Sequence, residues 1–481
     1  MFNFLKEKEE NASTAKIALW YMFASIFAKG VSSITTPIFT RLLTREEFGI
    51  VSNFTSWESI FLVIVTLDFS ASIMRAKYDF NNRIDEYMSS ILLFSNITTI
   101  FVYLIIELNQ QYFTEIMAMD ISLIRMMFLY ILFLPAFNYL QIKHRIYKKY
   151  KFFVAFTIVS VLLQTFTSLL LVMNLENKCL GRIYGIIIPA VCLNIILWIS
   201  IIQKGKKISY ECVKYASTIS IPLIPHALSG ILLGNSDRVM IMKFCGAEDT
   251  AMYSLAYSIS LLASLIWTSM NHAWSPWLFD NIHANHREII IKNSKIYLST
   301  FIILVTIIFL TAPEIIYFFG GEKYLQAKYV MPPVILGCVF QFMYAMYVNI
   351  EIYSKKTISI SIGTLFAATI NITLNLLFIP RYGYIAAAYT TMVGYACLLL
   401  FHYFIVKRKI SELLSIYNNK FILNVALFMT GFSILSLWLY DNTILRYCMI
   451  SLYFIFISLL IYKNKALIVN LFAIKSIGKK I

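Results

Sequence analysis

Charged side chains are scarce in this sequence. Asp, Glu, Lys and Arg make up only 14% of the 481 residues, whereas hydrophobic residues make up 59%. A soluble globular protein carries roughly 25% charged and about 45–50% apolar residues. Long apolar runs recur along the whole chain. This composition excludes soluble enzymes, disordered regulators and disulfide-stapled secreted domains, and predicts an all-α polytopic membrane protein.

Motifs for metal, disulfide and nucleotide chemistry are also missing. The seven cysteines include no CxxC pair, and the six histidines include no HExxH motif. No Walker motif is present, so ATP is not expected to drive this protein directly. No long connecting segment carries clustered Arg, His or Asp, which argues against a glycosyltransferase or polymerase. We therefore expect no metal, no cofactor and no catalytic residues.

The apolar runs match the length of membrane-spanning helices. A helix needs about 20 mainly apolar residues to cross the hydrocarbon core, and short connections leave no room for an extramembrane domain. The first run is too long for a cleavable signal peptide and lacks a small-residue cleavage site. We predict fourteen spans, at 17–40, 49–73, 87–107, 121–142, 152–173, 183–203, 216–242, 251–280, 296–319, 330–353, 358–379, 384–406, 421–440 and 447–462.

The basic residues indicate how the spans are oriented. Of the 41 Lys and Arg residues, 29 lie in one alternating set of connecting segments and nine in the other. Because Lys and Arg accumulate in cytoplasmic loops, this asymmetry predicts that both termini are cytoplasmic. The accumulation of basic residues in cytoplasmic loops also explains most of the net charge of +16. Nucleic acid is therefore not an expected partner.

A weak internal repeat divides the spans. Residues 41–54 align with 243–256 at an offset of 202, and each stretch joins the first two spans of a six-span block. We expect an N-terminal lobe over 1–214, a C-terminal lobe over 215–410 and two added helices over 411–481. Six is an even number, so the two lobes form a parallel repeat. Such lobes usually enclose a substrate path near the midplane, which indicates a transporter.

Lys29 is the strongest candidate for a functional charge inside the bilayer. It lies about 18 Å into the first span, and ionisable residues at this depth are costly and mark functional sites. It shares one helical face with hydroxyl side chains, which suggests a water-filled cavity suited to an anion. The alternative is a structural pair with a buried carboxylate such as Asp68. The residues of this face are Ser25, Lys29, Ser32, Ser33, Thr36 and Thr40.

The seventh span carries a second polar face. Pro222 and Pro225, followed by Gly230 and Gly234, predict a bent or locally unwound helix. Broken helices near the midplane often form transporter binding sites. The residues expected on this face are His226, Ser229, Gly230 and Asp237.

Asp237 and Arg238 are sequence neighbours that point about 100° apart on a helix, so they cannot pair with each other. Each therefore needs another partner. Arg238 could bind a substrate phosphate or a carboxylate on a neighbouring helix, and a structural pair is as consistent with the sequence as a ligand site.

Two carboxylates in the second span, Glu58 and Asp68, have two interpretations. They could bind a proton or sodium ion that is coupled to transport. Alternatively, they could neutralise the charge of a buried Lys29. Tryptophans in the eighth span could stack on sugar rings, although aromatic belts at the membrane interface account for most tryptophans of this kind.

Three further polar residues have structural interpretations. Glu351 precedes Lys355 by four residues and is expected to form a surface pair with it. Asn371 and Asn375 lie on one face of the eleventh span, where such side chains usually supply hydrogen bonds between helices.

Two stretches carry a resemblance to a known family. Residues 27–52, FAKGVSSITTPIFTRLLTREEFGIVS, and residues 220–260, beginning SIPLIPHALSG, resemble the first and seventh spans of Wzx-type polysaccharide flippases. These belong to the superfamily that also contains multidrug and toxin extruders. The fourteen spans in a 6+6+2 arrangement are similar as well. One departure is Ala251, where the family often has the glycine found at Gly49 in the first half.

The resemblance implies a flippase that moves undecaprenyl-pyrophosphate-linked oligosaccharide, such as an O-antigen repeat unit, across a bacterial inner membrane. It implies alternating access between the lobes, with lipid and other polysaccharide assembly proteins as partners. The cavity residues would be Lys29, Ser33, Thr36, His226, Asp237 and Arg238, with Glu58 and Asp68 available for ion coupling. The alternatives are a multidrug/cation antiporter of the same superfamily, a peptidoglycan-precursor flippase and a non-transporting scaffold.

Overall fold

The computed structural model describes residues 14–463, and within this range the chain forms helices and no strands. The long helices are α1 (Thr14–Leu42), α2 (Arg45–Thr66), α4 (Ile84–Leu108), α6 (Ile121–Ile146), α7 (Tyr150–Asn174), α8 (Lys178–Gly205), α10 (Ile224–Cys245), α11 (Ala247–His283), α12 (Arg287–Leu310), α14 (Met331–Tyr353), α15 (Ile358–Tyr382), α16 (Tyr384–Lys409), α18 (Asn419–Leu439) and α19 (Thr443–Lys463).

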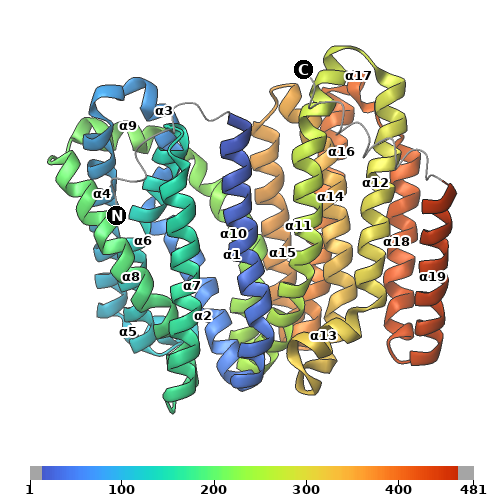
Figure 1. Cartoon of the computed structure of the whole chain (residues 1–481), viewed down its shortest axis with the longest axis horizontal. Coiled ribbons are helices and arrows are strands. Elements are labelled where there is room, and N and C mark those ends of the chain that lie inside the picture. Colours follow the sequence, from blue (N-terminus) through green and yellow to red (C-terminus); the bar gives the residue numbers. More distant parts are fainter. Residues whose placement is uncertain (1–13, 464–481) are drawn as a thin grey trace.

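Short helices connect these elements. They are η2 (Phe69–Ser72), α3 (Ile73–Asp79), η3 (Asn81–Arg83), α5 (Gln110–Met117), α9 (Tyr210–Ser220), η4 (Ile221–Leu223), α13 (Ala312–Gly320), η5 (Glu322–Val330) and α17 (Ser411–Leu414). We call the end of the molecule that carries α5 and α13 the outer end, and the end that carries α9 and α17 the inner end (Figure 1).

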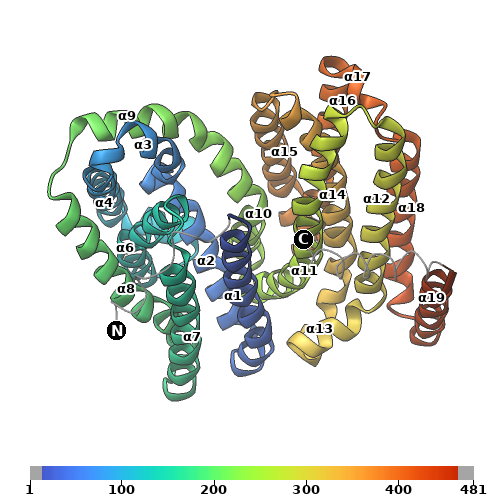
Figure 2. The ribbon, with the colours of Figure 1, turned by 45° about the horizontal axis from the view of Figure 1, so that its top comes forward.

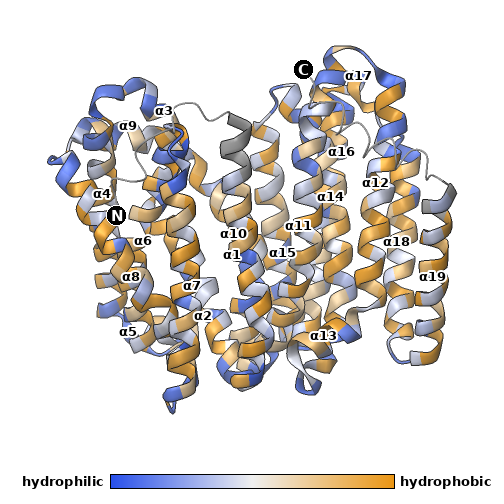
Figure 3. Ribbon diagram, viewed as in Figure 1, coloured by the Kyte–Doolittle hydropathy of each residue, from blue (hydrophilic) through white to orange (hydrophobic). Residues whose placement is uncertain are grey.

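The fourteen-helix prediction is confirmed in outline. Among the described residues, 13 helices are long and apolar enough to cross a membrane, and α19 adds a shorter apolar stretch, Thr443–Leu459. Apolar residues cover the middle of these helices, and hydrophilic residues gather at both ends (Figure 3). The predicted span 296–319 ends earlier, at Leu310, because Pro313 favours the start of a new helix, α13.

The helices form two groups. Helices α1 to α8 lie on one side and α10 to α16 on the other, with α18 and α19 at the far edge, and α9 leads from the first group to α10 (Figures 1 and 2). In α14, 83% of the apolar stretch is buried, so this helix forms the core of the second group. In α1 only 17% of the apolar stretch is buried, so most of this helix is not covered by the other helices.

Glycines allow a close contact between α7 and α8 in the first group. An added Cβ on Gly185 of α8 would lie 2.2 Å from the Cα of Ser168 in α7, and one on Gly181 would lie 2.8 Å from the Leu171 backbone. The Thr167 hydroxyl donates to the Gly185 carbonyl at 2.7 Å. Small residues of this kind let helix backbones approach closely within a membrane.

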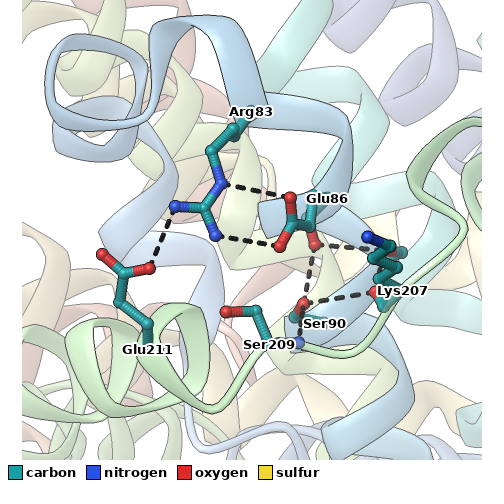
Figure 4. Close-up of polar contacts among 7 residues, drawn as sticks. Arg83, Glu86, Ser90, Lys207, Ser209 and Glu211 are labelled. Atoms are coloured by element: carbon teal, nitrogen blue, oxygen red, sulfur yellow. Dashed lines mark hydrogen bonds and ion pairs between the residues drawn. The ribbon is translucent and has the colours of Figure 1, made fainter.

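The connecting helix α9 is attached to the first group at the inner end. Arg83 lies between Glu86 of α4, at 2.9 Å, and Glu211 of α9, at 3.0 Å (Figure 4). One turn further along α9, the Tyr215 hydroxyl donates to Asp79. This hydrogen bond and a second one from Arg75 lower the pKa of the Asp79 carboxyl.

Glu351 corrects one expectation. It is fully buried and forms no surface pair with Lys355; instead its carboxylate lies 2.6 Å from His402 Nδ1, and the Ser359 hydroxyl donates to it. The His402 ring also stacks on Tyr344, with a centroid distance of 5.6 Å. The contacts of Glu351 with His402 and Ser359 therefore join α14, α15 and α16. The sequence did not reveal it because His402 is 51 residues away along the chain.

We predict that His402→Leu destabilises the protein by about 3–5 kcal/mol, because it leaves a buried carboxyl group without its partner. Thermal unfolding of the purified protein in detergent measures the effect. Adding Glu351→Gln should recover part of the loss. Equal stability of the wild type and the single variant would contradict a structural role for the pair.

Candidate functional site

A cavity of about 180 Å³ lies between the two groups of helices. The wall from the first group consists of Lys29 and three hydroxyl residues of α1, and the facing wall comes mainly from α11. The Lys29 cavity, as we call it, is lined by Lys29, Ser32, Ser33, Thr36, Ser258, Ile259, Leu262, Ser264, Leu265 and Phe319. The helical spacing in the sequence therefore correctly placed Lys29, Ser33 and Thr36 on one wall.

Lys29 has no carboxylate partner in the described part of the chain. Its side chain is exposed, and no Asp or Glu described there lies within 4.0 Å of its ammonium group. The pair with Asp68 that the sequence allowed does not form; Asp68 instead accepts a hydrogen bond from Ser70 at 2.8 Å. The cavity therefore presents an uncompensated positive charge beside hydroxyl groups, which is a suitable environment for an anion.

Contacts between the groups close the outer end of the molecule beyond this cavity. The Thr40 hydroxyl donates to the Phe319 carbonyl, Arg41 donates to the Phe318 carbonyl at 3.2 Å, and Lys323 donates to the Leu43 carbonyl at 2.7 Å. These contacts join the end of α1 to α13 and to η5. A ligand in the Lys29 cavity is therefore separated from the outer end by a layer of hydrogen bonds.

The second helix of each group strengthens this closure. Arg45, at the start of α2, forms an ion pair with Glu248, at the start of α11. An added Cβ on Gly49 would lie 1.9 Å from the Ala247 carbonyl oxygen, so the two helix ends touch through their backbones. Glu248 is the residue that the internal repeat aligns with Glu46, which means that equivalent turns of the two halves meet here.

A larger cavity lies elsewhere. It has a volume of about 910 Å³ at the outer end of the first group and contains the acidic residues Glu46, Glu47, Glu115, Asp120 and Glu176. Glu47 has a local role, because it accepts from the Thr44 backbone at 2.7 Å in a capping box that starts α2. The acidic lining of this larger cavity is unsuited to an anionic ligand, so we place the candidate site at the Lys29 cavity.

The interruption predicted for the seventh span occurs at the prolines. A 3₁₀ turn, Ile221–Leu223, separates α9 from α10, and α10 then continues without a break through both glycines. The break therefore lies near the inner end rather than at the midplane. His226 lies just after it, half-buried, with Nδ1 unpartnered, and it interacts electrostatically with Asp68 of the first group.

Asp237 is separate from the Lys29 cavity. It is fully buried among α10, α11, α15 and α16, and it accepts hydrogen bonds from Tyr253, from Thr391 at 2.5 Å, from Asn375 at 2.6 Å and from Asn371 at 3.4 Å. The two asparagines thus supply hydrogen bonds between helices. Four donors satisfy the carboxylate within the second group, which stabilises its packing.

Arg238 points away from Asp237 and has no carboxylate partner among the described residues. It donates to the Asn235 side chain at 3.0 Å, and its guanidinium lies 4.6 Å from the Tyr257 ring centre. Tyr257 lines a small cavity of about 70 Å³ that shares Ser264 with the Lys29 cavity. Arg238 therefore contacts the wall of a cavity that adjoins the Lys29 cavity, and does not line the Lys29 cavity itself.

Glu58 lies on α2, half-buried, with no ion pair to a described Lys or Arg. Its charge acts on Tyr130 of α6, so it faces the interior of the first group. The eighth-span tryptophans also pack inward: Trp274 is buried and stacks on Tyr297 with a centroid distance of 4.3 Å. Neither Glu58 nor Trp274 lines the Lys29 cavity.

The structure thus brings together Lys29, Ser33 and Thr36, but places His226, Asp237, Arg238, Glu58 and Asp68 outside the cavity lining. Sequence reasoning missed the facing wall, which includes Ser258 and Phe319, and it also missed the closing contacts of Arg41 and Lys323. Of these residues, only Ser258 could have been found from the sequence, since Ser254, Ser258 and Leu262 recur at helical spacing and so share one face of a helix.

Most of the chain is similar in fold to solved flippases and transporters. It matches a lipid II flippase, MurJ, in an inward closed conformation with a TM-score of 0.64 and 15% identity, over 93% of this chain and 99% of that one. It also matches an inward-facing multidrug resistance MATE transporter of the MOP superfamily with a TM-score of 0.59 and 14% identity, over 80% of this chain and 95% of that one.

Sequence comparison gives the family. Protein 1 of the Lsg locus of Haemophilus influenzae is 21% identical over 369 residues, which cover 72% of this chain and 86% of that protein. The family model described as "Polysaccharide biosynthesis protein" matches residues 14–282, more than half of the sequence. The chain therefore belongs to the polysaccharide biosynthesis protein family and has the multi-pass helical fold shared by the lipid II flippase and the MATE transporters.

Proposed function

We propose that this protein is a flippase for undecaprenyl-pyrophosphate-linked oligosaccharide, an O-antigen or similar surface polysaccharide repeat unit. It would move this substrate from the cytoplasmic to the periplasmic leaflet of a bacterial inner membrane, with both termini cytoplasmic. The observation that carries the proposal is the unpaired Lys29 in a hydroxyl-lined cavity between the two groups of helices. Membership of a polysaccharide biosynthesis family supports the same substrate class.

Each part of this substrate has a complementary surface. The Lys29 ammonium would bind the pyrophosphate, and the hydroxyls of Ser33, Thr36 and Ser258 would exchange hydrogen bonds with sugar hydroxyls. The lipid chain would stay in the bilayer, since α1 exposes apolar side chains such as Ile26 (53%) and Ile34 (73%). Arg238, outside the cavity lining, would add to the positive potential.

Transport by alternating access fits the outer closure. Residues 1–214 and 215–410 would act as the two lobes, with 411–481 as an addition, and the contacts of Thr40, Arg41, Arg45 and Lys323 would have to break for release. Two negative charges that move outward across about 100 mV, inside negative, gain about 4–5 kcal/mol. Ion coupling through Glu58 or Asp68 would add to this driving force.

A peptidoglycan-precursor flippase is a second candidate, because the fold matches a lipid II flippase over nearly the whole of both chains. A cation antiporter is less compatible with a cavity whose charged residue is Lys29. The two flippase functions are distinguished by the lipid-linked intermediate that accumulates when the protein is removed.

We predict that Lys29→Ala reduces export at least tenfold, because the loss of a charge-assisted contact costs about 1.5–3 kcal/mol. The measurement is the amount of untranslocated lipid-linked oligosaccharide in cells with matched protein levels. Lys29→Arg should restore export, since it keeps the charge. Ser25→Ala, one turn away on α1 and outside the cavity lining, is the matched control. Normal export by Lys29→Ala would exclude the anion site and leave the fold assignment intact.

We predict that Arg45→Glu weakens the closure of the outer end, because two like charges then face each other at Glu248. The pair is partly exposed (38% and 58%), so the gain in the open population should be about fivefold or less. A Ser33→Cys side chain, labelled from outside by a membrane-impermeant maleimide, reports the opening. The double swap Arg45→Glu/Glu248→Arg should return labelling to the starting level. Unchanged labelling in Arg45→Glu would show that the ion pair does not contribute to the closure.

A further inference from the structure

Another cavity lies on the surface of the first group that faces away from the second group. It has a volume of about 510 Å³ and runs between α4, α6 and α8, which form the edge of the molecule farthest from α18 and α19 (Figure 1). We call it the α4–α8 groove. It is lined by Leu93, Asn96, Ile97, Ile100, Leu132, Phe133, Ile195, Trp198, Ile199 and Ile208.

The groove is apolar, and its polar groups are satisfied internally. Asn96 donates to the Leu132 carbonyl at 2.6 Å and accepts from Trp198 Nε1 at 2.9 Å. The isoleucines on its walls are strongly exposed, with Ile97 at 56% and Ile208 at 58%. An apolar groove on a membrane-spanning surface faces the lipid chains of the bilayer.

A basic turn closes the inner end of the groove. Lys204, Lys206 and Lys207 directly precede Ile208, which belongs to the groove lining, and all three lysines are exposed. Lys206 is the left-handed C-cap that ends α8, two residues before Ile208 of the groove lining. The turn therefore places positive charge where the groove reaches the membrane surface.

Contacts with α4 hold this turn in position. The Ser89 hydroxyl donates to the Lys207 carbonyl at 2.9 Å. The Ser209 backbone donates to the Ser90 hydroxyl at 2.9 Å (Figure 4). Gly205 packs so closely on Ser89 that an added Cβ would lie 2.1 Å from its hydroxyl oxygen. The lysines are thus attached to a fixed backbone rather than to a free loop.

Two of these charges are uncompensated. Lys207 interacts electrostatically with Glu86, whereas Lys204 and Lys206 form no ion pair with any carboxylate in the described range. Along α4, Leu93 to Ile100 spans about 10 Å, which lies within the roughly 15 Å depth of one leaflet. The cavity therefore matches one lipid chain, and the turn matches an anionic headgroup at the surface of the same leaflet.

We infer that the α4–α8 groove is a binding site for an anionic phospholipid of the inner-end leaflet. The lipid phosphate binds Lys204 and Lys206, and one acyl chain fills the groove as far as Ile100. Basic residues beside a membrane surface contribute about 1 kcal/mol each to the binding of anionic lipid. This site is independent of the Lys29 cavity and would exist whether or not the transport proposal holds.

The test is native mass spectrometry of the full chain after delipidation and titration with phosphatidylglycerol or phosphatidylethanolamine. The wild type should retain phosphatidylglycerol in preference to phosphatidylethanolamine. Lys204→Gln/Lys206→Gln should reduce phosphatidylglycerol retention about 25-fold, or about fivefold per lysine, and leave phosphatidylethanolamine unchanged. Ile97→Trp, which fills the groove, should also reduce the retention of phosphatidylglycerol.

The matched control is Lys407→Gln/Lys409→Gln, which removes two exposed lysines from the last turn of α16, at the inner end of the second group. It should behave like the wild type. Equal loss in both double variants, or equal retention of the two lipids by the wild type, would overturn the site. Normal retention by Ile97→Trp would overturn the placement of the acyl chain. Thermal unfolding of each variant confirms that the comparison uses folded protein.

Discussion

Polar groups inside a membrane must be satisfied by the protein itself, because lipid offers no hydrogen bonds. Most buried polar residues described here obey this constraint. Asp237 receives four donors from three helices, and Glu351 is bound by His402 and Ser359. Lys29 differs, since its charge faces a cavity and pairs with no carboxylate of residues 14–463. That contrast, more than the presence of the charge alone, separates a site for a ligand from the groups that hold the fold together.

The two kinds of polar group also have different positions. The satisfied networks lie within one group of helices, where they make the group rigid. The Lys29 cavity and the closing contacts lie between the groups, where the Arg45–Glu248 ion pair is partly exposed. Alternating access requires that this interface rearrange while the interior of each group stays intact.

The sequence was sufficient for the features that depend on local periodicity. Apolar runs gave the spans because each must cover the same hydrocarbon thickness. Helical spacing placed Ser33 and Thr36 beside Lys29. The sequence could not give contacts between distant segments: Glu351 was expected at the surface because Lys355 is near in sequence, and the facing wall with Ser258 depends on how two helices meet. Asp237 and Arg238 were correctly separated from each other, but the burial of Asp237 is a tertiary property.

The outer closure has a further consequence for sequence variation. In three of its contacts the acceptor is a backbone carbonyl, at Phe318, Phe319 and Leu43, near the end of α13 or just beyond the end of α1. A carbonyl oxygen remains whatever side chain the residue carries. Homologous chains can therefore change these three positions without losing the acceptors, whereas Thr40, Arg41 and Lys323 must keep a donor. In each of these contacts, only the residue that supplies the donor side chain is constrained in type. The residue that supplies the carbonyl oxygen can vary.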